Sequence, residues 1–189
     1  MKIDENGLLQ SVEYLPSPNC DDRPDGVPVD LVVIHGISLP PGRFGGPWIS
    51  QLFTNQLNQD EDPYFAEICD LKVSSHLLIR RDGKVIQYVP FAKRAWHAGE
   101  SCFQGRHRCN DFSIGIELEG ADDQPYANIQ YEQLAEIVAM IIDHYPGVTE
   151  QRVTGHADIS PQRKTDPGQA FDWVLFRKLL ASLPQVDKT

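Results

Sequence analysis

A polar loop near the end of the chain carries residues that are typical of a metal site. The segment 155–168 contains a histidine, two aspartates and a lysine, and its prolines and glycines prevent a regular helix. Ordering such a loop costs conformational entropy, which a bound ligand or metal would offset. His156 and Asp166 are ten residues apart, a spacing that a bent loop can close. We therefore predict that these two side chains share one metal ion.

A third candidate ligand ends the most apolar run of the chain. Residues 31–34 predict a buried strand, and His35 follows where a glycine and a Pro-Pro-Gly turn begin. Open sheets place ligands beyond strand ends of this kind. Two neutral imidazoles and one carboxylate form the ligand set of a catalytic zinc, with the fourth position left for water. Asp158 competes with Asp166, but a ligand two residues from His156 would strain the loop, and Asp158 can instead bond a backbone turn.

A strand with strict alternation supplies a candidate general base. In residues 112–119 the polar side carries Ser113, Gly115, Glu117 and Glu119, and the two small residues are expected to leave room for a substrate. Glu117 near zinc could take a proton from water and pass it to a leaving amine. Periodicity makes Glu119 equivalent, and either could be a solvated strand residue. Lys164 could place its ammonium over an oxyanion, or it could be an ordinary surface lysine.

Aromatic and cationic side chains elsewhere suit a substrate that carries a sugar and carboxylates. Trp96 lies on a predicted loop, where it could stack on a sugar ring or anchor the loop to the core. Lys72, Arg106 and Arg108 are cationic points in an acidic protein. They could bind carboxylates, although each alone is most often a solvated charge.

The bulk composition limits the partners and the compartment. The chain has 189 residues, 41% of them hydrophobic, enough for one domain with a core. Its net charge of −10 argues against nucleic acid and anionic membranes as partners. No apolar run predicts a signal peptide or a membrane span, so we expect a cytoplasmic protein with four free thiols.

The predicted elements form an α/β (mixed α+β) fold in which helices flank a central mixed sheet. After an irregular lead-in over residues 1–30, the pattern predicts a strand at 31–35 and a short helix at 47–53. Residues 73–80 and 84–90 predict a hairpin with a type I′ turn at Asp82-Gly83, so the sheet cannot be wholly parallel. The third strand has an apolar side formed by Phe112, Ile114, Ile116 and Leu118. Amphipathic helices follow over 131–145 and from Trp173 to Leu180.

Five segments together resemble the AmpD family of cytoplasmic zinc amidases, which cleave N-acetylmuramoyl-L-alanine bonds in anhydro-muropeptides during cell-wall recycling. The segments are 33–35, 37–42, 94–99, 110–120 and 155–168. The resemblance covers nearly the whole chain, and the segments occur in the family's order. The resemblance implies one zinc amidase domain over residues 1–189, with a fold shared with phage amidases of the lysozyme type and peptidoglycan-recognition proteins. It also implies a small muropeptide substrate and no obligate protein partner.

The resemblance also assigns the site residues that spacing leaves open. It implies one zinc per chain with the ligands His35, His156 and Asp166. It places the proton acceptor on Glu117 rather than Glu119 and the transition-state cation on Lys164. Hydrolysis would then be a single step without a covalent enzyme intermediate.

Substrate contacts are expected from Trp96 to the sugar and from Lys72 and Arg108 to stem-peptide carboxylates. Two positions depart from the family pattern. Gly36 replaces an asparagine, and Lys72 replaces an arginine, which keeps the charge without the bidentate geometry.

Two other functions fit part of the pattern. A binding module without catalysis should lack a zinc ligand, whereas all three are present here. A zinc peptidase that cuts within the stem peptide would use the same metal chemistry and is distinguished by its products.

Overall fold

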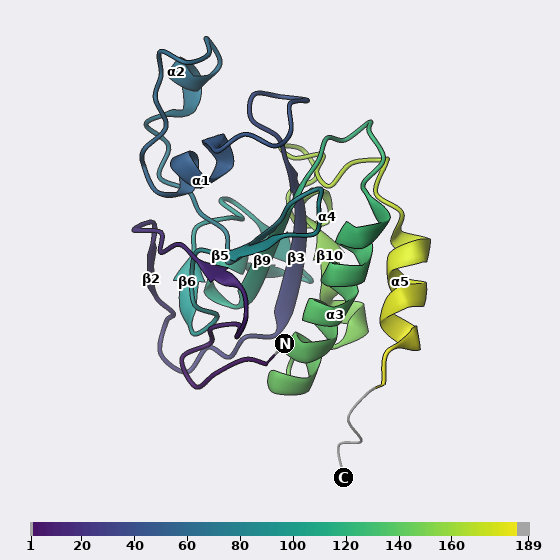
Figure 1. Ribbon diagram of the computed structural model, residues 1–189. Helices are drawn as coiled ribbons and strands as arrows, with labels where there is room; N and C mark the ends of the chain where they lie inside the picture. The colour runs from purple at the N-terminus through teal and green to yellow at the C-terminus, as the bar shows by residue number, and fades with distance from the viewer. Residues whose placement is uncertain (1, 185–189) are drawn as a thin grey trace.

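The computed structural model describes residues 2–184, and its centre is a six-stranded sheet (Figure 1). The strand order is β1-β5-β4-β9-β3-β10. The bounds of these strands are Glu13–Tyr14 (β1), Val85–Gln87 (β5), Leu77–Ile79 (β4), Ser113–Glu119 (β9), Leu31–Ile37 (β3) and Val153–Gly155 (β10). All neighbouring pairs are parallel except β4 and β5, which form an antiparallel hairpin. The expected mixed sheet is confirmed.

Helices and short paired strands complete the chain. The helices are α1 (Trp48–Phe53), α2 (Phe65–Ile68), α3 (Asn128–His144), α4 (His156–Ile159) and α5 (Trp173–Ser182), with 3₁₀ turns at Cys109–Asp111 and Glu150–Arg152. Outside the main sheet, β2 (Cys20–Asp22) pairs with β6 (Lys93–Ala95), and β7 (Cys102–Phe103) pairs with β8 (Arg106–His107). Over residues 2–184, no helix has the length and apolar character needed to cross a membrane.

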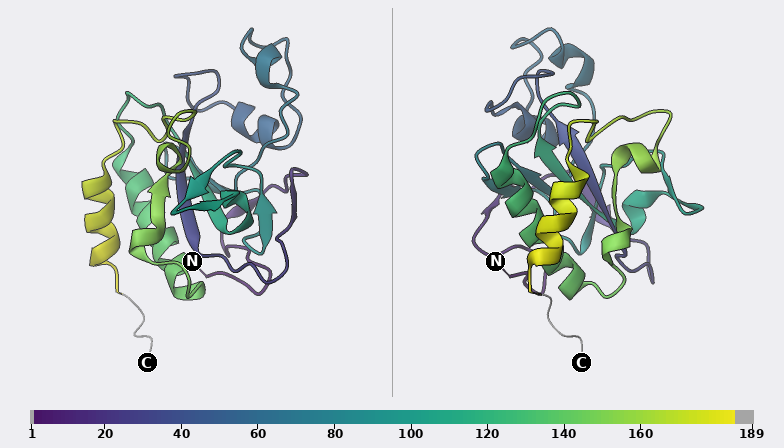
Figure 2. Two further views of the ribbon diagram at one scale, coloured as in Figure 1. Left: turned by 180° about the vertical axis from the view of Figure 1, so that it is seen from behind. Right: turned by 90° about the vertical axis from the view of Figure 1, so that its right-hand side faces the viewer.

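Two layers of apolar side chains enclose the sheet. Helices α3 and α5 lie side by side on one face, as both views in Figure 2 show, and their apolar stripes pack on Val32, Ile34 and Ile116. The other face is covered by α1 and by Phe65 of α2. Because the sheet is covered on both faces, all seven residues of β9 are buried, including both glutamates.

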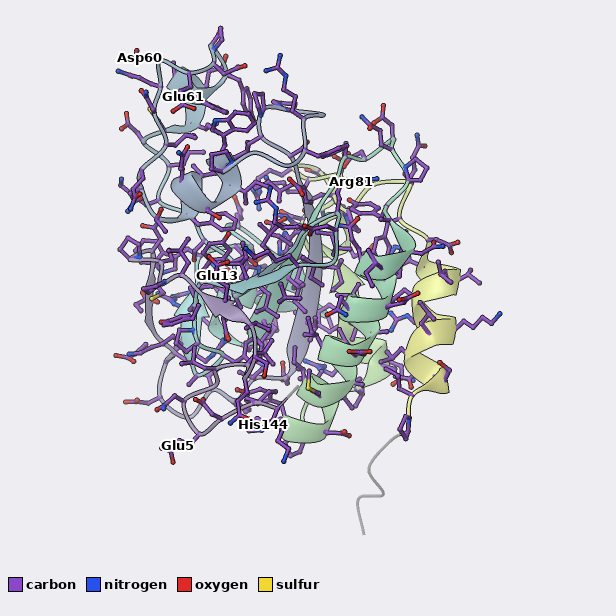
Figure 3. All side chains as sticks on the ribbon, in the orientation of Figure 1. Glu5, Glu13, Asp60, Glu61, Arg81 and His144 are labelled. Atoms are coloured by element: carbon purple, nitrogen blue, oxygen red, sulfur yellow. The ribbon has the colours of Figure 1, made fainter. Side chains whose placement is uncertain are left out.

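The segment that contains α2 projects from the body beyond the sheet (Figure 1). Figure 3 shows Asp60 and Glu61 at the far end of this projection. The Trp48 indole donates a hydrogen bond to Glu61 at 2.8 Å, which ties the projection to α1.

Three local expectations are corrected. The segment 1–30, expected to be irregular, contains β1 and β2. Phe112 packs with Leu31 and Val33, because it closes a 3₁₀ turn before β9 begins and so leaves the alternation of that strand. The expected type I′ turn is wrong as well, because that turn needs positive φ at both central residues and only Gly83 has it, at +84°. The loop is a three-residue connection, with the Gly83 amide donating to the Arg80 carbonyl.

Candidate metal centre and active site

The three candidate ligands converge at the carboxyl end of the central strands. His35 lies near the end of β3, His156 begins α4 directly after β10, and Asp166 lies in the following loop. The Nδ1 atoms of the two histidines are 2.9 Å apart, and Asp166 Oδ2 lies 3.2 Å from His35 Nδ1 and 3.1 Å from His156 Nδ1. One ligand atom from each residue therefore faces a common point, within 4.8 Å of the others.

The second ring nitrogen of His156 fixes its tautomer. His156 Nε2 lies 3.3 Å from the Ala98 carbonyl oxygen, which can only accept a hydrogen bond. In the neutral form of the ring the proton therefore sits on Nε2, and the Nδ1 lone pair faces the common point. Metal-binding histidines usually have such a partner on the ring nitrogen that does not bind the metal.

A chain of hydrogen bonds fixes the tautomer of His35 in the same way. The Ser113 hydroxyl donates to the Cys109 carbonyl at 2.6 Å, so the Ser113 oxygen accepts from His97 Nε2 at 3.1 Å. His97 Nδ1 is then an acceptor, and His35 Nε2 donates to it at 2.9 Å. His35 Nδ1 is left with its lone pair toward the common point. Burial lowers the pKa of His35 to about 4 and the pKa of His97 well below its ordinary value, so both rings are neutral near pH 7.

His97 is the residue of this site that sequence reasoning missed. Its sequence signals are its place directly after Trp96 and within segment 94–99, one of the five segments that carry the family resemblance. The structure also corrects the expectation that Gly115 and Ser113 leave room for a substrate. A Cβ at Gly115 would lie 2.5 Å from the His97 ring, so this glycine makes room for the histidine.

Two polar side chains near His97 bond to the backbone of β9. The Arg23 guanidinium donates to the Ser113 carbonyl at 2.9 Å and lies 3.2 Å from His76 Nε2. His76 Nδ1 accepts from the Gly115 amide at 3.0 Å. The backbone of β9 is thereby fixed next to the hydrogen-bonded residues Ser113, His97 and His35.

Strand pairing places a glutamate beside the ligands. His35 and Glu117 are direct partners in the parallel ladder of β3 and β9, so their side chains share one face. Glu117 Oε1 lies 4.0 Å from His35 Nδ1, and the buried Oε2 has no hydrogen-bond partner among the described residues. Burial, followed by the negative charge of Asp166, raises the pKa of Glu117 well above its ordinary value, and the charge of Lys164 opposes this. A buried carboxylate without a partner is suited to proton transfer.

Glu119 differs from Glu117 in its contacts, and this difference distinguishes the two candidate bases that periodicity left equivalent. Its Oε1 accepts from the Gly45 amide at 2.6 Å and pairs with Arg80 at 3.3 Å, and its Oε2 accepts from the Arg81 amide. Glu119 therefore holds loops together, whereas one oxygen of Glu117 has no hydrogen-bond partner in the described part of the chain. Neither is solvated, because both are buried.

The competing carboxylate, Asp158, is also occupied. It accepts hydrogen bonds from the Gly155 amide at 2.9 Å and from the Thr154 hydroxyl at 2.7 Å. These contacts cap the start of α4, so Asp158 lies outside the group of three converging ligand atoms.

A cavity of about 780 Å³ opens over this group, within the size range of ligand sites. Its polar lining includes Glu117, Lys164 and Asp166, and Trp96 also lines it. Apolar side chains from α1 and from the projecting segment form another part of the lining; they are Leu52, Phe53, Tyr64, Ile68, Leu71 and Val73. The cavity can thus hold a ligand with both polar and apolar parts.

Lys72 and Arg108 are not among the lining residues. Lys72 is exposed, between Leu71 and Val73, which do line the cavity. The Arg108 side chain is 72% exposed and pairs with Asp111 at 3.1 Å. The structure therefore brings together the ligands, Glu117, Lys164 and Trp96, and leaves the two stem-peptide cations outside the cavity.

Comparisons with known proteins show which family the chain resembles. The family model described as N-acetylmuramoyl-L-alanine amidase matches residues 25–169. The 1,6-anhydro-N-acetylmuramyl-L-alanine amidase AmpD of Escherichia coli (strain K12) is 58% identical over 94% of this chain and 96% of its own length. A crystal structure of a Se-Met AmpD derivative superposes with a TM-score of 0.92 at 56% identity, covering 95% of this chain and 99% of its own.

A more distant structure contains a substrate. It is the complex of the N-acetylmuramyl-L-alanine amidase AmiD from E. coli with anhydro-N-acetylmuramic acid-L-Ala-D-gamma-Glu-L-Lys. It is 29% identical to this chain with a TM-score of 0.59, over 91% of this chain and 60% of its own.

Proposed function

The chain belongs to the N-acetylmuramoyl-L-alanine amidase family, and within it to the AmpD proteins, and from this we infer that it is a zinc enzyme of peptidoglycan recycling. It is an amidase that acts on 1,6-anhydro-muropeptides. The proposed reaction is hydrolysis of the amide bond between anhydro-N-acetylmuramic acid and L-alanine. We propose that the whole chain, 1–189, acts as one zinc amidase domain.

One observation carries the zinc assignment: three ligand atoms of the right types converge beside a buried carboxylate, one oxygen of which has no hydrogen-bond partner among residues 2–184. Two imidazole Nδ1 atoms and one carboxylate oxygen match the ligand set of catalytic zinc. Both rings present a lone pair because their other nitrogens have partners. The residues present therefore fit one zinc ion held by His35, His156 and Asp166. When bound, zinc would polarise a water molecule and the scissile carbonyl.

The remaining chemistry falls to two side chains. Glu117 takes a proton from the attacking water, and its raised pKa makes it the stronger base. The Lys164 ammonium offsets the negative charge that develops on the carbonyl oxygen. Glu117 then returns the proton to the alanine nitrogen as the carbon–nitrogen bond breaks. The products are a free carboxyl on the sugar and a free peptide amine, and no bond to the protein forms.

The substrate contacts follow the same proposal. Trp96, in the cavity lining, would contact the sugar. Lys72 and Arg108 would reach the stem-peptide carboxylates from outside the cavity. The proposed partner is a small muropeptide alone. We also propose that the enzyme works in the cytoplasm, a reducing compartment that matches its four free cysteines.

Mass spectrometry of the products from a purified anhydro-muropeptide tests this function. We expect anhydro-N-acetylmuramic acid and the intact stem peptide, and we expect a chelator to stop their formation until zinc is added back. Cleavage within the stem peptide would contradict the amidase, and full activity after complete metal removal would contradict the zinc dependence.

A further inference from the structure

A tyrosine outside the proposed chemistry fills a slot between the ends of the two central strands. Tyr126 lies in the loop between β9 and α3 and is 5% exposed. A Cβ on Gly36, the neighbour of His35, would lie 2.2 Å from the Tyr126 hydroxyl oxygen. A Cβ on Gly120, which follows Glu119, would lie 2.2 Å from Tyr126 Cε1. Real Cβ contacts are not that short, so both glycines make room for this one side chain.

The hydroxyl at the end of this slot meets the loop that carries Asp166. Tyr126 donates a hydrogen bond of 2.9 Å to the carbonyl of Pro167, the next residue after Asp166. Burial raises the pKa of Tyr126 above its ordinary value, so the hydroxyl keeps its proton and remains a donor. From the other side, the Ala157 amide donates to the Asp166 carbonyl at 2.9 Å. The backbone on both sides of the Asp166–Pro167 peptide is thus anchored, once next to His156 and once by Tyr126.

We propose that Tyr126 is a positioning residue for Asp166, acting through the Pro167 carbonyl. We also propose that Gly36 and Gly120, which lack a Cβ, leave the space that the Tyr126 side chain occupies. The proposal rests on the proposed role of Asp166 as a metal ligand. Asp166 has no regular secondary structure to hold it, so its carboxylate oxygen reaches the two histidines only while the loop is held. Partners that hydrogen-bond to a metal ligand itself commonly change metal affinity by about 10- to 100-fold when removed, and Tyr126 acts one residue further along the ligand's loop.

The same aromatic cluster contains a matched control. Tyr131 packs against Tyr126 and Phe171, and its hydroxyl also makes one hydrogen bond, accepting from the Asp172 amide at 2.7 Å. That bond leads to the start of α5, away from the ligands. Tyr126→Phe and Tyr131→Phe therefore remove the same atom from the same cluster, and only the first removes a bond to the Asp166 loop.

Zinc affinity, measured by competition with a chromogenic chelator, tests the proposal independently of activity. We expect Tyr126→Phe to weaken zinc binding about tenfold or more and Tyr131→Phe to leave it unchanged, with similar thermal stability of the two metal-free variants. Unchanged affinity in Tyr126→Phe, or an equal loss in Tyr131→Phe, would overturn the proposal. Asp166→Ala, measured in parallel, separates a failure of the positioning role from a failure of the metal site. If this variant binds zinc as tightly as the parent protein, the proposed metal site itself is wrong.

A rescue experiment tests the slot directly. A methyl group at position 36 would lie 2.2 Å from the hydroxyl oxygen but 3.5 Å from Tyr126 Cζ, which is ordinary contact. We therefore expect Gly36→Ala to weaken zinc binding in the parent protein beyond the loss in Tyr126→Phe. Adding Tyr126→Phe to Gly36→Ala should restore affinity to the level of Tyr126→Phe alone. Additive losses would contradict the slot.

Gly120→Ala is the control for this rescue. Its methyl group would lie 2.2 Å from Cε1 and 2.7 Å from Cζ, atoms that phenylalanine keeps. Tyr126→Phe should therefore not rescue Gly120→Ala. Equal rescue at positions 36 and 120 would show that the hydroxyl is not the group that Gly36 accommodates, and the proposal would fail.

Discussion

Replacing Glu117 by glutamine removes the proposed proton acceptor and changes little else. The side chain is buried, one oxygen has no partner among the described residues, and the other lies 4.0 Å from His35 Nδ1. The variant should therefore keep its zinc and lose the ability to accept a proton from water. Loss of a general base lowers kcat by about 10²–10⁴-fold, and a hundredfold loss corresponds to about 2.7 kcal/mol of transition-state stabilisation.

The assay is steady-state hydrolysis of an anhydro-muropeptide, with zinc content measured on the same samples. Glu119→Gln is the matched control, because Glu119 is two residues away on the same face of β9 and is bonded to Gly45, Arg80 and Arg81. We expect Glu119→Gln to lower stability and to lose less than about tenfold in kcat. Equal losses of kcat in the two variants, or a larger loss in Glu119→Gln, would refute the assignment.

The Glu117→Gln variant also makes a prediction about stability in the absence of metal. Burial raises the pKa of Glu117, so the ionised carboxylate destabilises the folded state. This penalty is absent below the pKa of the unfolded chain, near pH 4, and grows as pH rises through the folded-state pKa. In chelator, Glu117→Gln should therefore melt at a higher temperature than the parent protein at pH 7 to 8, and the difference should vanish toward about pH 4. A variant that is less stable at pH 8 would contradict the buried, unpaired carboxylate.

The remaining predictions concern three other positions. Lys164→Ala should lower kcat by about 10²–10³-fold with less change in KM, and steady-state kinetics that show only a higher KM would make Lys164 a substrate-positioning residue. His97→Phe should weaken zinc binding in a chelator competition by about tenfold or more, since the partner of His35 Nε2 is lost; unchanged affinity would contradict the tautomer chain. Arg108→Ala should raise KM for a tripeptide substrate about tenfold and leave kcat nearly unchanged, whereas an unchanged KM would exclude contact with the stem peptide.

The sequence predicts the elements whose residues carry a regular pattern. The apolar run before His35, the predicted alternation over 112–119 except for Phe112, and the apolar stripes of α3 and α5 all correspond to elements of the structure. These patterns arise because burial of one face or both faces selects residue types along the chain. The turn at Asp82-Gly83 shows where the approach fails, because the dipeptide suits two turn types and the flanking residues decide between them.

The contacts between distant segments could not be predicted in this way. No local rule shows that Glu119 is bonded to three loop groups whereas one Glu117 oxygen has no partner among the described residues. The partners of Glu119 come from segments 38 to 74 residues away. The roles of two glycines were equally hidden. Gly115 accommodates the His97 ring and Gly36 accommodates the Tyr126 hydroxyl, and a glycine in a sequence does not say which atom needs its space.

Several contacts that the sequence does not reveal have the same effect in the site, because they hold the proposed ligands in place. Each proposed ligand is held by a partner that is not itself a ligand: His35 by His97, His156 by the Ala98 carbonyl, and Asp166 through the neighbouring Pro167 carbonyl. Buried polar groups that lack a partner are costly, so each of these bonds also satisfies a group that the fold must bury. The residues that hold the ligands therefore also contribute to the stability of the fold. Substitution of a ligand should abolish metal binding, whereas substitution of a holding residue should weaken it by a measurable factor.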